Sequence, residues 1–121
     1  MALSILIVDD NASFLEASSA LLEREGLSVV AIASTVAEAL AETDRFGPDV
    51  VLVDIMLGRE SGFELTRRLI DDSRGKRPAV ILISTHLESD FADLIAASPA
   101  SGFIPKSELS AKAIRAILER Q

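Results

Sequence analysis

The fold is decided by residues 5–10, which read ILIVDD, and by residues 50–54, which read VVLVD. Each is a short apolar run that ends abruptly in carboxylate. Continuous apolar runs of this length are typical of strands buried on both faces of a parallel sheet. Such sheets bind ligands at the carboxyl ends of their strands, so we expect Asp9, Asp10 and Asp54 to converge in one crevice. Three carboxylates in one pocket favour a bound cation.

The composition is that of an ordinary globular domain. The chain has 121 residues, of which 49% are hydrophobic, and this suits one domain over residues 1–121. It contains neither a run of roughly 18 apolar residues nor a signal-peptide pattern, so we expect a cytoplasmic protein. The absence of cysteine excludes disulfides, thiolate chemistry and cysteine zinc sites.

The charge of the chain argues against direct nucleic acid binding by this segment. Its formal net charge is -7, whereas neutralising phosphates requires clustered Lys and Arg. One basic cluster interrupts this pattern, and we interpret it as a solvated helix end and loop. Its members are Arg67, Arg68, Arg74, Lys76 and Arg77.

Strand-like and helix-like runs alternate along the sequence. We expect strands at residues 3–8, 27–33, 49–53, 79–84 and 102–104. A helix should follow each strand: Asn11 and Thr35 are the expected N-caps of the first two, Gly58 and Gly62 form a loop before the third, and the fourth covers residues 89–97. This alternation predicts an α/β fold with a five-stranded parallel sheet covered on both faces.

The residues at the strand ends carry the candidate chemistry. They are Asp9, Asp10, Asp54, Ser84 and Lys106. Mg²⁺ prefers hard oxygen ligands and retains several waters, so one or two carboxylates hold it together with substrate oxygens. A carboxylate in such a site can attack phosphorus to form an acyl phosphate, while an ammonium and a hydroxyl neutralise the transferring oxygens.

Together these residues resemble the receiver domain of two-component response regulators, and the resemblance spans the whole chain. The matching pieces are IVDD at residues 7–10, VDIML at 53–57, IS at 83–84 and FIPK at 103–106. They occur in the family's order and at closely matching spacings. The resemblance implies a flavodoxin-like, doubly wound (βα)5 fold with strand order 2-1-3-4-5.

The same resemblance implies roles for the acidic residues. Asp54 corresponds to the aspartate that accepts a phosphoryl group from a sensor histidine kinase, a phosphotransfer protein or a small phosphodonor. Asp9, Asp10, Asp54 and the backbone carbonyl of Met56 correspond to the groups that bind Mg²⁺. The chain is then a signalling switch, and an enzyme only in catalysing its own phosphorylation and dephosphorylation.

Three further positions correspond to the family's signalling residues. Ser84 and Lys106 match the groups that contact the phosphoryl group, and Ser84 with Phe103 matches the switch pair. Phosphorylation is reported in the family on the surface of the fourth helix, fifth strand and fifth helix. The candidate contact residues there are Phe91, Leu94, Ile95, Lys112, Ala113 and Ile117.

The sequence departs from the commonest family pattern after the lysine. Many receivers have proline there with a cis peptide bond, whereas this chain has Ser107. A cis bond between Lys106 and Ser107 would cost roughly 2.5 to 4 kcal/mol. The geometry of this peptide is therefore left open by the sequence.

Partners are implied only by class. They are the phosphodonor protein, an output domain or downstream protein, and a second copy in a phosphorylation-dependent homodimer. No membrane partner is expected.

Three alternative functions fit parts of the pattern. An aspartyl phosphatase related to haloacid dehalogenases would place a second acid two residues after the first, but Asn11 stands there. A flavodoxin-like electron carrier would not place Asp9 and Asp10 in a phosphate loop. A pseudo-receiver that binds partners without phosphorylation remains the principal alternative.

Overall fold

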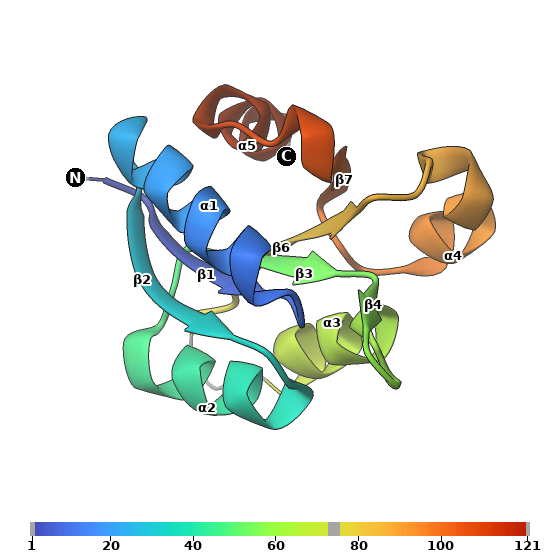
Figure 1. The fold of residues 1–121 in the computed structure, drawn as a ribbon. Coiled ribbons are helices and arrows are strands. Elements are labelled where there is room, and N and C mark those ends of the chain that lie inside the picture. Colours follow the sequence, from blue (N-terminus) through green and yellow to red (C-terminus); the bar gives the residue numbers. More distant parts are fainter. Residues whose placement is uncertain (1, 73–75, 121) are drawn as a thin grey trace.

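The apolar runs form the centre of a five-stranded parallel sheet in the computed structural model, which describes residues 2–72 and 76–120 (Figure 1). The strands are β1 (Ser4–Val8), β2 (Ser28–Ala33), β3 (Val50–Asp54), β6 (Ala79–Ser84) and β7 (Gly102–Pro105). Their order is β2-β1-β3-β6-β7, and each neighbouring pair is parallel. Counted along the chain, this is the predicted order 2-1-3-4-5, so the fold class is confirmed.

Helices cover both faces of the sheet. Successive residues of a strand point to opposite faces, so each strand contributes apolar side chains to both cores. The helices are α1 (Ala12–Arg24), α2 (Val36–Phe46), α3 (Gly62–Asp71), α4 (Ala92–Ala97) and α5 (Ala111–Glu119). In β1, Ile5 and Ile7 belong to the core beneath α1 and α5, whereas Leu6 and Val8 belong to the core beneath α2 and α3. Figure 1 shows α1 and α5 on one side of the sheet and α2 and α3 on the other.

The register of the strands brings their carboxyl ends to one level. Val8 of β1 pairs with Val53 of β3, so Asp9 and Asp54 follow at equivalent positions. Ser84 of β6 pairs with Pro105 of β7, which directly precedes Lys106. The sheet therefore delivers polar residues from four strands to the same edge.

The predicted N-caps begin the first two helices. The side chain of Asn11 accepts a hydrogen bond from the Phe14 N–H at 3.1 Å, and that of Thr35 accepts one from the Glu38 N–H at 3.1 Å. Such caps satisfy N–H groups that have no partner inside the helix. Both assignments made from the sequence are confirmed.

Several predicted boundaries are corrected. The expected loop with Gly58 and Gly62 contains an antiparallel hairpin of β4 (Met56–Leu57) and β5 (Glu60–Ser61), and Gly62 is the first residue of α3. The fourth helix is a 3-10 turn, η1 (Glu88–Phe91), followed by α4. A two-residue strand carries no readable alternation, which is why the sequence predicted a loop.

The chain after β7 forms a short 3-10 turn, η2 (Lys106–Glu108). All peptide bonds among the described residues are trans, including that between Lys106 and Ser107. Within the basic cluster, Arg67, Arg68, Lys76 and Arg77 are exposed, while Arg74 lies outside the described residues. Across the same described part of the chain, no helix has the length and apolar character to cross a membrane.

Candidate functional site

The carboxyl edge of the sheet gathers three aspartates. Asp9, Asp10 and Asp54 each offer a carboxylate oxygen, and these oxygens lie within 4.8 Å of one another. Asp9 and Asp54 are buried, while Asp10 is exposed. Oxygen ligands at such separations are suited to one small, hard cation.

Lys106 joins two of these aspartates. Its Nζ lies 2.5 Å from Asp9 Oδ2 and 3.3 Å from Asp54 Oδ2. The side chains of all three residues are largely shielded from water, with 13% exposure for Lys106, 0% for Asp9 and 10% for Asp54. Water therefore screens this pair of contacts less than it screens an ordinary surface ion pair.

Burial raises the pKa of the Asp54 carboxyl above its usual range, and the nearby charge of Asp9 adds to the effect. Lys106 and a hydrogen bond from the Met56 N–H to Asp54 Oδ1, at 3.2 Å, oppose it. The net direction is upward because desolvation and a like charge both disfavour the ionised carboxylate. A further cation would offset both the burial of the carboxylate and its repulsion by Asp9.

The two carboxylate oxygens of Asp9 have different partners. Its Oδ1 accepts a hydrogen bond from the Asn11 N–H at 2.8 Å. Its Oδ2 is buried and, apart from the Lys106 ammonium, has no hydrogen-bond donor within the described residues. The Lys106 charge compensates this oxygen, but one ammonium faces three clustered carboxylates, which leaves an excess of negative charge at the site. The acidic group therefore fits a divalent metal ion.

Two glycines border this group, one at a left-handed turn and one against the Asp54 main chain. A side chain at Gly58, whose φ is +61°, would face Asp10 Oδ2 at 3.7 Å. A Cβ at Gly62 would lie 2.9 Å from the carbonyl carbon of Asp54 and closer still to its oxygen. Gly62 thus lets α3 begin directly against the end of β3. The sequence marked both glycines only as loop residues.

Ser84 lies at the same edge, but its hydroxyl is already engaged. The Oγ accepts a hydrogen bond from the His86 N–H at 2.9 Å and lies 3.4 Å from His86 Nδ1. The His86 ring meets Phe91 edge-on, with ring centroids 5.6 Å apart. Ser84 is 1% exposed, so a bound group reaches its hydroxyl only if the loop containing His86 adjusts.

Phe103 and Met56 border the site in different ways. Phe103 is half-buried in β7 and packs against the core beneath α2 and α3. Met56 is 51% exposed, and its N–H is one of the donors to Asp54. The structure therefore brings the acids, Lys106 and Met56 together and places Ser84 and Phe103 on adjoining strands.

Phe14 is a site residue that the sequence did not reveal. Lys106 Nζ lies 4.4 Å from the centroid of its ring, a distance typical of a cation–π contact. In the sequence, Phe14 follows a helical apolar pattern with Leu15, Leu21 and Leu22, which predicts only a buried stripe of the first helix. Phe14 lies in the first turn of α1, and nothing in the sequence pointed to its contact with a lysine at the other end of the chain.

One residue of the predicted partner surface is corrected by the structure. Leu94 on α4 is 54% exposed, in keeping with a contact surface, but Ile117 on α5 is only 4% exposed. The Ile117 side chain lies where a Cβ at Gly102 would be, so it packs between α5 and β7. Its assignment as a partner-contact residue was wrong.

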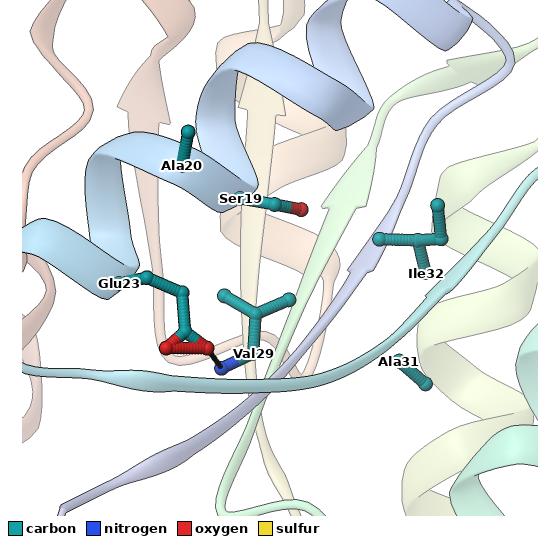
Figure 2. Close-up of a pocket in the computed structure, with 6 residues that line it drawn as sticks. All are labelled: Ser19, Ala20, Glu23, Val29, Ala31 and Ile32. Carbon is teal, nitrogen blue, oxygen red and sulfur yellow. Dashed lines mark hydrogen bonds between the residues drawn. The ribbon is translucent and has the colours of Figure 1, made fainter.

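A separate hollow of about 400 Å³ lies between α1 and β2 (Figure 2). The residues that line it are Ser19, Ala20, Glu23, Val29, Ala31 and Ile32. Figure 2 shows the Glu23 carboxylate accepting a hydrogen bond from the Val29 N–H, at 2.9 Å, on this edge strand. The hollow has a single charged side chain, so the acidic edge is the stronger candidate for chemistry.

Comparison with known proteins gives consistent relatives. The chain is 35% identical to a protein-glutamate methylesterase/protein-glutamine glutaminase of Oleidesulfovibrio alaskensis, over 86% of this chain and 28% of that protein. It is 32% identical to a putative transcriptional regulator of Pseudomonas aeruginosa, over 93% of this chain and 56% of that protein. The chain therefore spans between about a quarter and just over half the length of these curated relatives.

Solved structures and the family model agree with these relatives. The fold is similar to a LuxR-family two-component response regulator from Aurantimonas, with a TM-score of 0.86, 30% identity, and coverage of 100% of this chain and 88% of that one. It is also similar to a CheY-like receiver domain protein from Methanospirillum hungatei, with a TM-score of 0.80, 27% identity, and coverage of 99% and 94%. The model of the response regulator receiver domain matches residues 5–119. The chain therefore belongs to the response regulator receiver domain family.

Proposed function

We propose that this chain is a phosphorylation-dependent switch of a two-component phosphorelay, and that it accepts a phosphoryl group on Asp54 with Mg²⁺ present. Membership of the receiver family supports phosphoacceptor signalling as the class of function. The observation that carries the proposed role of Asp54 is the contact of one largely shielded lysine, Lys106, with both Asp9 and Asp54 beside a third acid. A structural ion pair does not require two extra carboxylates.

The metal in this proposal is held by this chain's own oxygens. Asp9, Asp10, Asp54 and the main-chain carbonyl of Met56 would bind Mg²⁺, with water and phosphoryl oxygens as the other ligands. When bound, the ion supplies positive charge against the oxygens of the transferring group. The raised pKa of Asp54 and the clustering of three carboxylate oxygens within 4.8 Å support this assignment.

The chemical step proposed for Asp54 is a displacement at phosphorus. A carboxylate oxygen donates an electron pair to phosphorus, and the bond to the donor's leaving group breaks. That group, the imidazole of a histidine or the carboxylate of acetyl phosphate, departs with the bonding pair. Lys106 moves its contact from Asp54 to a phosphoryl oxygen, and the Ser84 hydroxyl leaves His86 to donate to another.

The reverse of the switch is hydrolysis of the aspartyl phosphate. Water attacks phosphorus, inorganic phosphate leaves, and the Asp54 carboxylate is restored. The chain thus promotes only its own phosphorylation and dephosphorylation, and it does not process a separate substrate. In this proposal, residues 1–121 act as one receiver domain in the cytoplasm.

The signal is proposed to pass from Ser84 to Phe103 as the hydroxyl turns toward the phosphoryl group. The outcome would be read on the surface of α4, β7 and α5 by an output domain, a downstream protein or a second copy. The donor would be a sensor histidine kinase or a phosphotransfer protein. The relatives support these classes of partner without identifying one.

Intact-protein mass after incubation with acetyl phosphate tests the proposal. Three proteins are compared with and without Mg²⁺: the unaltered chain, Asp54→Asn, and Asp49→Asn as a matched control from the other end of β3. The expected result is one added phosphoryl mass that requires Mg²⁺ and Asp54 but not Asp49. No adduct with any donor, despite measured Mg²⁺ binding, would instead support a pseudo-receiver interaction module.

A further inference from the structure

The aromatic ring of Phe14 lies directly against the ammonium of Lys106. We propose that Phe14 is a positioning residue, which holds Lys106 toward Asp54 and thereby accelerates phosphorylation. This inference rests on the proposed function of Asp54. It assigns a role in the site to a residue that is otherwise part of the first helix's apolar stripe.

The three contacts of Lys106 support this role. An ammonium has three N–H donors, and two of its neighbours here are Asp9 Oδ2 at 2.5 Å and Asp54 Oδ2 at 3.3 Å. The third neighbour is the Phe14 ring, with 4.4 Å between Nζ and the ring centroid. Because the lysine side chain is only 13% exposed, the ring replaces water on that side of the charge.

The main chain that carries the ring is fixed by the first turn of α1. The Phe14 N–H donates to the capping side chain of Asn11 at 3.1 Å, and the Phe14 carbonyl accepts the Ser18 hydroxyl at 2.6 Å. The half-buried side chain packs against the core beneath α1 and α5. A partner held on a helix in this way positions a flexible lysine more firmly than a loop side chain would.

The chemistry of the contact suits a lysine that must move. The face of an aromatic ring attracts a cation through its quadrupole but does not fix it with a directional hydrogen bond. Lys106 is thus kept inside the site, yet it remains free to shift from Asp54 to a phosphoryl oxygen. Leucine would fill similar space without attracting the charge, so the ammonium would be held toward Asp54 less firmly.

Rates of adduct formation with acetyl phosphate and Mg²⁺ test this role. We expect Phe14→Leu to slow formation by roughly three- to tenfold, which is the range of a partly desolvated cation–π contact. Phe14→Tyr keeps the ring and should restore the rate. Phe46→Leu is the matched control, because Phe46 lies beneath another cation, Arg45, at 5.0 Å on α2. Its rate should not change.

Two further measurements separate positioning from stability. In a Lys106→Met background, Phe14→Leu should cause no additional slowing, whereas additive slowing would overturn the proposal. In the unphosphorylated protein, the Lys106 ε-methylene protons should show an upfield ring-current shift that Phe14→Leu removes. An equal rate in Phe14→Leu, with adduct formed normally, would also overturn it.

The ring-current shift, measured by NMR, distinguishes failure of this inference from failure of the proposed function. If the unaltered chain forms no adduct, phosphorylation of Asp54 is rejected. The proposal that Phe14 accelerates it is then rejected with it, even where the ring-current shift shows the contact itself. If the adduct forms but the shift is absent, only the role of Phe14 is rejected.

Discussion

Strand β3 has an aspartate at each end, and each aspartate contacts a lysine in different surroundings. Asp49, just before the strand, forms an ion pair with Lys76, and Asp54, its last residue, contacts Lys106. Asp49 also accepts hydrogen bonds from the N–H and hydroxyl of Ser4, at 2.9 and 3.1 Å. The first pair is well satisfied and partly open to water, whereas the second is buried beside another acid.

The pKa directions express this difference. The hydrogen bond from Lys76, followed by that from the Ser4 N–H, lowers the pKa of Asp49. Burial, followed by the charge of Asp9, raises the pKa of Asp54 despite its lysine. The same residue types, five positions apart, thus give a structural contact at one end of the strand and a group that needs a further cation at the other.

The largest expected effect comes from removing the lysine that contacts Asp54, with removal of the lysine that contacts Asp49 as the control. Lys106→Met should slow adduct formation from acetyl phosphate by about 10²-fold, because a group that stabilises transition-state charge is lost. Lys76→Met should leave the rate unchanged. Time courses of intact mass measure both rates. Equal slowing in the two variants would remove the functional distinction between the ends of β3.

A second prediction concerns the backbone behind Asp54. Gly62→Ala places a methyl group against the Asp54 carbonyl, where main-chain atoms cannot easily move aside. We expect the free energy of unfolding to fall by about 1 to 3 kcal/mol, as for other overpacked sites. Denaturant unfolding followed by circular dichroism measures it.

Gly102→Ala is the control for this prediction. There the added methyl meets side-chain atoms of Ile117, the nearest at 2.9 Å, which can shift more readily than main chain. Its loss of stability should be smaller. A larger loss for Gly102→Ala would show that the end of β3 is not unusually constrained.

The third prediction compares the two ends of β3 by their contribution to Mg²⁺ binding. Asp10→Asn should weaken Mg²⁺ binding at least about tenfold, since even partners outside the direct ligands contribute on that scale. Asp49→Asn should bind Mg²⁺ as the unaltered chain does, because Asp49 lies at the opposite end of β3. Isothermal titration calorimetry compares the affinities. Equal weakening by both changes would argue against a metal site at the carboxyl edge.

The fold was predictable from the sequence because each central strand is a separate apolar run between helix signals. Asp54 was also predictable, since it interrupts such a run. What the sequence could not supply was side-chain neighbours across long separations. Lys76 pairs with Asp49 over 27 positions, and Phe14 meets Lys106 from the other end of the chain.

Apolar residues show the same limit. Periodicity marks Phe14 and Ile117 as facing one side of a helix, but it does not say whether that side meets core, cation or solvent. Phe14 contacts both core residues and the Lys106 ammonium, whereas Ile117 contacts core residues. The sequence did not predict the hairpin of β4 and β5, because each of its strands has only two residues.

The smallest expected effect is on stability as a function of pH, without divalent metal, and the two aspartates should act with opposite sign. Asp49 has a lowered folded-state pKa, so its stabilisation is present above about 3.8 and is lost as pH falls through the lowered value. Asp49→Asn should therefore be less stable than the unaltered chain at pH 7, by about 0.2 to 1 kcal/mol for the ion pair. The deficit should shrink in acid.

Asp54 has a raised folded-state pKa, so its favourable contribution is present below 3.8 and is lost as pH rises through the raised value. Asp54→Asn, which never ionises, should consequently gain stability relative to the unaltered chain as pH increases from 4 toward 7. Urea unfolding at several pH values in the presence of a chelator measures both slopes. If the two variants instead changed with the same sign, the charge at the carboxyl end would be as well satisfied as that of Asp49, and the physical reason for a cation there would disappear.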